Sequence, residues 1–333
     1  MKKKIILSYD YELFFGQRSG TVLKTIIEPT YRLLDIMESV GLRGNFFVDY
    51  LMFRELEKQK DVRAQHDLKL LKKQIKDIVR RGHRIELHLH PHWLDAKYNG
   101  DGTWNFDDFT HYSLSSLDEN VITDLFVKGA TYLNLLAMDV DATYRVVAFR
   151  AGGWAVQPFD KIKAGFMESG ILIDSSTSYG IYKNMKDSFY DFRCMPEKCL
   201  YRFEEDVCEE KIEGRFIEVP ITSFHRNLFL VLVDRFYGGK LHYFDKISDG
   251  THFRLPEGEG NCKIGIKERL RKKIMFSLSM QSAITIKWAL LNHKRQDIYC
   301  YIDHPKDFSK ATEKGILTLG ERCESVHYID LIK

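Results

Sequence analysis

Three histidines at alternate positions are the part of this sequence that most clearly could do chemistry. The segment HRIELHLHPH carries them as His88, His90 and His92. Neutral imidazole is a common transition-metal ligand, whereas charged imidazoles this close together would repel one another. The spacing therefore favours a shared metal ion over a structural role, without showing which two histidines bind it. Two imidazoles, one carboxylate and an open position form the usual catalytic zinc site.

Other ionisable side chains stand where strands are expected to end. They are Asp10 and Glu12, then Arg150, Asp174 and Glu218, and finally Asp303 with His304. Each alone has an ordinary explanation, because an aspartate at a strand end often caps the following helix. Barrel enzymes, however, place their catalytic groups at the carboxyl ends of parallel strands. We therefore expect these side chains to gather with the histidines at one end of a barrel.

Short apolar segments and longer helical segments alternate along the chain, which is the pattern of repeated β–α units. Helices are expected over 29–38, 67–81, 158–169 and 282–293, with a further helix opened by a capping box at Ser116–Glu119 and running to about Leu136. Strands are expected at 4–10, 43–48, 83–90, 145–150, 171–176, 216–221 and 297–302. Seven parallel strands suit a closed barrel better than an open sheet. The predicted fold class is α/β, a distorted (β/α)7-type parallel barrel.

Two stretches interrupt this alternation. Residues 177–215 are rich in Tyr, Cys, Glu and Lys without a clear period, and residues 222–281 combine the apolar run LFLVLVDRFY with a glycine-containing loop. We interpret both as insertions that decorate one barrel domain spanning 1–333. Residues 268–293 are basic and then largely apolar, so an interfacial helix that touches a lipid-linked substrate is an alternative to a buried barrel helix.

Composition narrows the classes of partner and location. A net charge of +3 shows no strong basic bias, so we expect no nucleic-acid partner. Six cysteines without a C-x-x-C pair argue against a disulfide scaffold and a structural zinc site, and fit reduced thiols. Asp10 and Glu12 interrupt the N-terminal apolar run before a secretory segment can form. We therefore expect a cytoplasmic protein.

Two of these motifs resemble those of the NodB-type polysaccharide deacetylases (carbohydrate esterase family 4). GHRIELHLHPH is similar to the family's second motif, which implies that His88 and His92 bind the metal and leaves His90 over. SYDYE (8–12) resembles the first motif and implies that Asp10 is the catalytic base. Tyr11 fills the place of the usual second aspartate, so the resemblance implies Glu12 as the metal ligand, with His90 as the alternative.

Three further motifs follow in the family's order. FRAGGW (149–154) resembles the third and implies that Arg150 orients the catalytic aspartate, although the usual Pro-Tyr is missing. ILIDSS is similar to the Asp-Ser-Ser strand, where Asp174 would order Arg150 or line the site. IDHPKD resembles the last motif and implies that His304 is the general acid. The resemblance covers roughly residues 4 to 308 and is strongest to the WalW-like branch, which is associated with surface-polysaccharide gene clusters.

The resemblance implies a metal-dependent hydrolase that removes the N-acetyl group of an amino sugar or polysaccharide precursor. The implied cofactor is a divalent metal, zinc first and cobalt or nickel as alternatives. Trp93 and Trp154 adjoin two motifs and would either stack on sugar rings or pack at the rim. Two other functions remain open: a deformylase or cyclic-amide hydrolase on the same fold, and a sugar-binding relative without catalysis.

Overall fold

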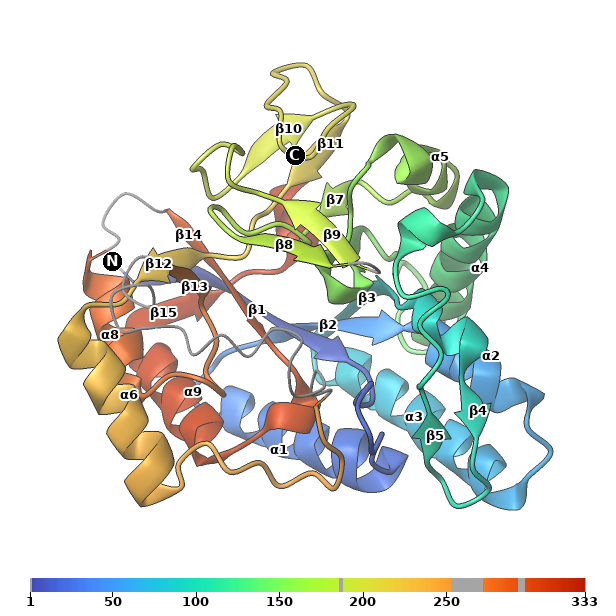
Figure 1. Ribbon diagram of the computed structural model, residues 1–333, viewed down its shortest axis with the longest axis horizontal. Coiled ribbons are helices and arrows are strands. Elements are labelled where there is room, and N and C mark those ends of the chain that lie inside the picture. The colour runs from blue at the N-terminus through green and yellow to red at the C-terminus, as the bar shows by residue number, and fades with distance from the viewer. Residues whose placement is uncertain (1, 186–187, 253–271, 293–296, 333) are drawn as a thin grey trace.

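The computed structural model describes residues 2–185, 188–252, 272–292 and 297–332. Its centre is a curled, mostly parallel sheet that forms a half-barrel with helices around it (Figure 1). The parallel strands run in the order β11 (Phe216–Glu218), β7 (Ile173–Asp174), β6 (Ala148–Ala151), β3 (Arg84–Leu89), β2 (Gly44–Asp49), β1 (Lys3–Tyr11) and β14 (Ile298–Asp303). All seven predicted strands are therefore confirmed, as is the predicted fold class.

The two edges of this half-barrel approach each other without forming a regular ladder. After β11, the Thr222 amide donates to the Cys300 carbonyl of β14 at 2.9 Å. The Phe276 amide donates to the Thr222 carbonyl at 2.8 Å, and the Ile302 amide to the Phe276 carbonyl at 3.0 Å. Single residues thus bridge the gap, which is why the barrel is distorted. The sheet also includes β10 (Tyr201–Phe203), antiparallel to β11, and β15 (Cys323–Ser325), parallel to β1.

Alternation along β1 separates the side chains that pack from those that reach the site. Tyr9 and Tyr11 belong to the large core between sheet and helices. Ile6 belongs to a second cluster of buried side chains, which come from the strands, from residues next to the strands and from Tyr328 near the C-terminus. This cluster fills the barrel interior. Successive side chains of a strand point to opposite faces. Asp10 therefore shares the interior face of Ile6, while Tyr11 faces the helices.

The helices cover the outside of the sheet. They are α1 (Glu28–Ser39), α2 (Tyr50–Lys58), α3 (Val62–Arg80), α4 (Glu119–Met138), α5 (Asp160–Ser169), α8 (Ala283–Asn292) and α9 (Lys310–Arg322). The sequence predicts all of these except α2 and α9. The predicted capping box is wrong, because α4 begins after Asp118 without a side-chain cap, and Ser116 ends the preceding 3-10 helix. Only α4 among the described helices is long and apolar enough to cross a membrane, but it packs against β3 and α5 as core helices do.

The two predicted insertions contain short elements of their own. The first forms a hairpin of β8 (Tyr182–Met185) and β9 (Ser188–Asp191), followed by β10. The second contains the antiparallel pair β12 (Ser223–His225) and β13 (Lys273–Met275) and the helix α6 (Leu228–Leu241), while 253–271 lies outside the described residues. The small hairpin β4 (Lys97–Tyr98) and β5 (Trp104–Asn105) follows β3. Within 268–293, α8 buries Thr285, Ile286, Ala289 and Leu290, as a helix of the barrel does.

Candidate active site

Adjacent strand ends bring the predicted base and its arginine together. Asp10 lies near the end of β1, and Arg150 lies on β6 in register with His88 of β3. The Arg150 guanidinium donates from Nη1 to Asp10 Oδ1 at 2.6 Å and from Nε to the Ser175 carbonyl at 2.8 Å. Arg150 is fully buried and Asp10 nearly so. A buried carboxylate held by an arginine stays ionised and keeps its orientation.

Glu12, the first residue after β1, lies between two cationic groups. Lys306 donates from Nζ to Glu12 Oε1 at 2.7 Å, and His88 Nε2 lies 2.9 Å from Glu12 Oε2. Burial raises the pKa of Glu12, but Lys306 and the hydrogen bond with His88 outweigh it and hold the pKa well below its usual range. Glu12 is therefore ionised, with one oxygen committed to the ammonium and the other facing the imidazole.

His88 is oriented by the backbone of the next strand. Its Nδ1 lies 2.7 Å from the Arg150 carbonyl oxygen, which can only accept, so Nδ1 carries a proton and Nε2 faces Glu12. This is the arrangement that fixes the tautomer of many metal-binding histidines. Burial lowers the pKa of His88, but Glu12 and Asp10 outweigh it and raise that pKa to about 9. The imidazole of His88 is therefore protonated near neutral pH and pairs with Glu12.

His90 and His92 lie in an aromatic environment instead. The ring of His90 lies tilted against that of Phe15 with centroids 3.9 Å apart, and the ring of His92 lies 4.6 Å from that of Phe109. Burial lowers the pKa of both imidazoles, so both are neutral near pH 7. His90 Nδ1 is buried without a hydrogen-bond partner among the described residues, whereas hydrogen bonds with the backbone of Phe106 and Asp108 raise the pKa of His92 against the effect of burial. Buried polar atoms left unsatisfied in this way call for a ligand or a water.

The three predicted metal ligands are not assembled to the same degree. Glu12 and His88 are in contact, and the ring centroid of His90 is 6.1 Å from that of His88 and 6.0 Å from that of His92. The charge of Glu12 raises the pKa of His90 against the effect of burial. His90 is therefore a near neighbour of both predicted histidine ligands.

His304 lies immediately after β14, within reach of both carboxylates of the first motif. Its Nε2 is 3.6 Å from Asp10 Oδ2 and 3.7 Å from Glu12 Oε1, and its Nδ1 is 3.4 Å from Asp307 Oδ2. Burial first and Lys306 second lower the pKa of His304. His304 is therefore neutral at rest and faces the carboxylate that the resemblance implies as the base.

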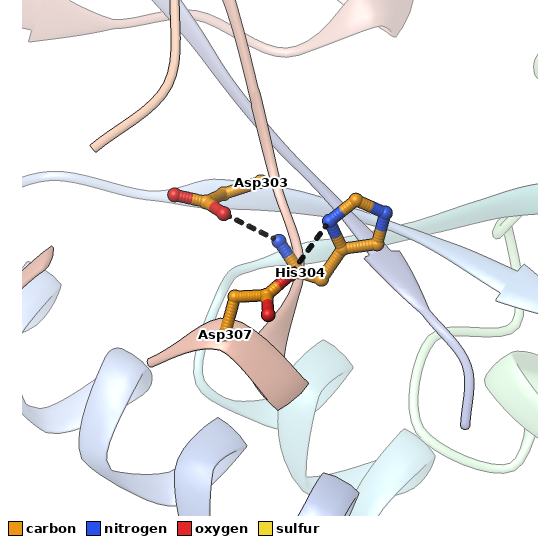
Figure 2. Close-up of side chains that lie close together, drawn as sticks. All are labelled: Asp303, His304 and Asp307. Carbon is orange, nitrogen blue, oxygen red and sulfur yellow. Dashed lines mark hydrogen bonds and ion pairs between the residues drawn. The ribbon is translucent and has the colours of Figure 1, made fainter. Parts of the chain in front are cut away.

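Asp303, His304 and Asp307 are the one group of possible metal ligands within the described residues whose ligand atoms lie within 4.8 Å of one another (Figure 2). Both oxygens of Asp303 already accept hydrogen bonds, Oδ2 from Tyr301 at 2.6 Å and Oδ1 from the His304 amide at 3.0 Å. Burial raises the pKa of Asp303 to about 6. An ion in this group would have to displace these donors, whereas Nδ1 of His90, the first residue after β3, has no hydrogen-bond partner among the described residues.

Asp174 lies on β7, the strand next to the β6 strand of Arg150, and is not hydrogen-bonded to Arg150. It accepts from the Ser176 amide at 3.0 Å and from Ser176 Oγ at 2.7 Å. Glu218, its register partner on β11, is fully buried, and burial followed by the charge of Asp174 raises the pKa of Glu218 well above its usual value. Burial and the neighbouring Asp174 therefore favour the protonated form of Glu218. Arg150 is instead held by Ser175, the residue next to Asp174.

The two tryptophans of the sequence prediction differ in accessibility. Trp93 is fully buried, with its ring against Trp104 and Phe106 at centroid distances of 5.0 and 4.8 Å. No face of that ring is open to a sugar, so the predicted stacking role of Trp93 is corrected to core packing. Trp154 is partly exposed and has a φ of 60°, a left-handed conformation that is costly outside glycine and often found at functional sites.

Sequence reasoning missed two residues of this site. Lys306 is almost fully buried, and its ammonium also donates to the Leu13 carbonyl at 2.9 Å. Asp49, at the end of β2 and in register with His88, has a buried Oδ2 without a partner, and burial raises its pKa to about 7. The position of Asp49 at a strand end was a usable signal. Nothing in the sequence indicated that Lys306, two residues after His304, would be buried.

A polar cavity of about 700 Å³ opens next to the histidines. It is reached past Phe109, whose ring lies against His92. Carboxylates, amides and a hydroxyl that line it could hydrogen-bond the hydroxyl groups of a sugar. The lining residues are Asp95, Lys97, Asn99, Asn105, Asp107, Asp108, Phe109 and Thr110.

The sequence matches no protein-family model and no curated protein. Similar solved structures include a presumed polysaccharide deacetylase from Mycobacterium smegmatis, at 16% identity and a TM-score of 0.47, covering 100% of this chain and 90% of that one. A polysaccharide deacetylase from Bacillus cereus is 10% identical with a TM-score of 0.41, and the match covers 98% of this chain and 94% of that one. A 4-alpha-glucanotransferase from Thermococcus litoralis is 11% identical with a TM-score of 0.47, and the match covers 98% of this chain but only 37% of that one. These values are too low to transfer an activity to this chain.

Proposed function

We propose that this chain is a metal-dependent deacetylase of the NodB type, which hydrolyses the N-acetyl group of an amino sugar or glycan. The observation that carries this proposal is the convergence of Asp10, Glu12 and His304 beside His88. Asp10 accepts a hydrogen bond from Arg150 at 2.6 Å, and its Oδ2 lies 3.6 Å from His304 Nε2. A carboxylate base and an imidazole acid across one small space are what amide hydrolysis requires.

The residues fit a divalent metal, and zinc is our first choice, with cobalt or nickel as alternatives. Glu12 Oε2 and His88 Nε2 face each other, and the third ligand would be a nitrogen of His92 or of His90, whose buried Nδ1 has no hydrogen-bond partner among the described residues. One carboxylate and two imidazoles form a usual catalytic zinc set. An ion bound there would polarise the acetyl carbonyl and acidify a water molecule.

The chain's own residues supply the proton transfers. Asp10 Oδ2 is free of Arg150, which holds Oδ1, so Oδ2 can accept the proton of the attacking water. His304 Nε2, 3.6 Å from that oxygen, would take this proton over from Asp10 and deliver it to the leaving nitrogen. Because burial lowers the pKa of His304, its imidazolium is a strong proton donor once formed. Asp307 Oδ2, 3.4 Å from Nδ1, orients the ring.

Lys306 would maintain the charge of the site. Its ammonium holds Glu12 Oε1 and keeps the carboxylate ionised, so that Oε2 remains available to an ion. The polar cavity beside His92 would accept neighbouring sugar units. Trp154, partly exposed, remains a candidate for stacking on a ring, whereas Trp93 does not.

Acetate release from N-acetyl sugars tests the proposal. Nucleotide-linked, lipid-linked and oligomeric N-acetyl sugars would be offered to the full chain after chelation and after return of zinc or cobalt. We expect release that chelation abolishes and the metal restores. Faster turnover of N-formyl than of N-acetyl substrates would make the chain a deformylase. Undiminished release by the chelated protein would overturn metal dependence, and binding of a sugar without release would indicate a lectin-like relative.

A further inference from the structure

Helix α6 has its apolar side chains on the outside of the protein. It lies at the left edge of Figure 1 beside α8, against which it packs. Only Leu230 and Asp234 of this helix are buried. Phe229 is 63% exposed, Leu232 54% and Phe236 55%. Surface helices normally turn such side chains toward the core, so α6 is inverted with respect to the expected pattern.

The exposed side chains of α6 form a stripe with a cation on each side. With about 3.6 residues per turn, Leu228, Leu232, Phe236 and Phe229 project over one side of the helix. Arg235 lies at one border of the stripe and Lys240 at the other, and both are exposed. This is the layout of helices that lie in a membrane interface, where long basic side chains extend toward the head groups. We call these six residues the α6 stripe.

The neighbouring helix α8 extends the α6 stripe with the same chemistry. Ile284 and Leu291 of α8 are exposed, as is the preceding Met280, and Lys287 adds a further exposed cation. Neither helix has an exposed acid. The single acid of their sequences, Asp234, is buried and accepts hydrogen bonds from the Ser282 amide at 2.9 Å and Thr285 Oγ1 at 2.7 Å. The exposed charge of both helices is thus entirely positive.

We propose that the α6 stripe lies in the surface of an anionic lipid bilayer. Apolar contact with the acyl region and attraction of Arg235, Lys240 and Lys287 to acidic head groups act together there. A protein partner would have to match a convex helix with aromatic side chains, whereas a bilayer adapts to it. This proposal does not depend on the catalytic one, because it rests on side chains outside the site.

The segment after α6 leads directly to the candidate active site. Ser248 Oγ donates to the Lys306 carbonyl at 2.6 Å, and His252 Nε2 lies 2.6 Å from Asp307 Oδ1. This segment therefore joins the end of α6 to residues that adjoin His304 in the chain.

Sedimentation of the full chain with vesicles tests the proposal. We expect binding to vesicles of phosphatidylcholine mixed with phosphatidylglycerol, weaker binding to phosphatidylcholine alone, and weakening by salt. The double variant Phe229→Ser, Phe236→Ser should weaken binding at least about tenfold, because two aromatic side chains lose their apolar contact. Arg235→Glu should reduce the preference for the anionic vesicles. Leu135→Ser, an exposed apolar residue of α4, is the matched control and should bind as the parent does.

Other outcomes overturn the proposal. If the α6 stripe is an interface between two copies, the parent will be a dimer by light scattering, the double variant a monomer, and neither will bind vesicles. A monomer that binds neither vesicle also contradicts it, as does equal binding by the parent and the double variant. Circular dichroism checks that the variants fold, which the exposure of the substituted residues leads us to expect.

Discussion

The half-barrel contains two centres of buried carboxyl groups, and their surroundings are opposite. At the end of β1, Asp10 is held by Arg150 and Glu12 by Lys306 and His88. On β7 and β11, Asp174 and Glu218 face each other with hydroxyl and amide donors but no cation in hydrogen-bond contact.

The difference shows how one residue type acquires two roles. A cation beside a buried carboxylate keeps it charged, whereas a second carboxylate forces the pair to retain a proton. The β1 centre thus has the charged carboxylate that we propose as a metal ligand, whereas in the centre of β7 and β11 the neighbouring carboxyl group favours the protonated form of Glu218. Burial alone does not distinguish them, because Asp10, Glu12, Asp174 and Glu218 are all buried.

The strongest test of the comparison replaces the proposed base. Asp10→Asn should keep the metal bound, because Asp10 is not among the proposed ligands, and lower the rate of acetate release by about 10²- to 10⁴-fold. Steady-state kinetics and metal analysis of the purified variant measure the two effects. Glu218→Gln is the matched control from the other centre and should retain the parent's rate. Near-normal turnover by Asp10→Asn would place the base elsewhere.

The cation of the β1 centre can be removed directly. Lys306→Met would leave Glu12 buried beside His88 and the neutral imidazole of His304. Removing one partner of a buried ion pair typically costs about 3–5 kcal/mol of unfolding free energy. Because an imidazole still pairs with Glu12, we expect a loss at the lower end, about 3 kcal/mol. Urea denaturation measures it.

A matched exposed pair provides the control for this substitution. Lys128 lies 2.7 Å from Asp124 on the surface of α4, where such pairs contribute about 0.3–0.5 kcal/mol. Lys128→Met should therefore change stability little. A loss no larger in Lys306→Met than in Lys128→Met would show that the ammonium does not stabilise the buried carboxylate.

The other centre should reveal itself through pH. The pKa of Glu218 is raised in the folded protein above its ordinary value of 4.5, so the folded state holds a proton that the unfolded chain releases. The stability that this proton contributes is complete below about pH 4.5 and declines as the pH rises, by at most about 1.4 kcal/mol per pH unit. Glu218→Gln keeps a donor toward Asp174 but cannot titrate.

Urea denaturation at a series of pH values above 4.5 compares Glu218→Gln with the parent. We expect the stability of the parent to fall more steeply with pH than that of the variant, so that the two curves diverge. Other groups whose pKa is raised, such as Asp49 and Asp303, contribute equally to the pH dependence of stability in both proteins. Their contributions therefore cancel in the difference. Parallel curves would mean that Glu218 is already ionised and that the two centres do not differ as described.

The sequence predicted the sheet well because each strand is a short apolar run bounded by charge or glycine. Helix α2 was missed because it follows β2 without a linker, beginning at Tyr50 directly after the capping residue Asp49. Helix α9 begins at a capping box formed by Ser309 and Thr312, a pair that lacks the acidic residue of the usual signal.

The residue types of the candidate site were predictable, but their states were not. Strand alternation places Asp10 inside the barrel, and the motifs name Arg150 and His304. Which lysine is buried, and which carboxyl group holds a proton, depends on neighbours far away in the chain. Lys306 meets Glu12 across 294 positions and Glu218 meets Thr177 across 41. Periodicity carries no information about such pairs.

The smallest expected effect separates the metal site from its packing. Tyr11 adjoins both Asp10 and Glu12 in the chain, yet its ring is fully buried in the core between sheet and helices, and its hydroxyl donates to Gln74 Oε1 of α3 at 2.8 Å. Tyr11→Phe removes this hydrogen bond and leaves Gln74 Oε1 without that donor, which should cost about 0.5–1.5 kcal/mol of unfolding free energy. Metal affinity, measured by calorimetry, should stay the same, whereas Glu12→Gln should weaken it severely. Burial first raises the pKa of the Tyr11 phenol well above its usual value, so the phenolate that a metal would bind is disfavoured. If Glu12→Gln binds the metal as tightly as the parent, or if Tyr11→Phe binds it more weakly, the proposed assignment of Glu12 as the metal ligand is wrong.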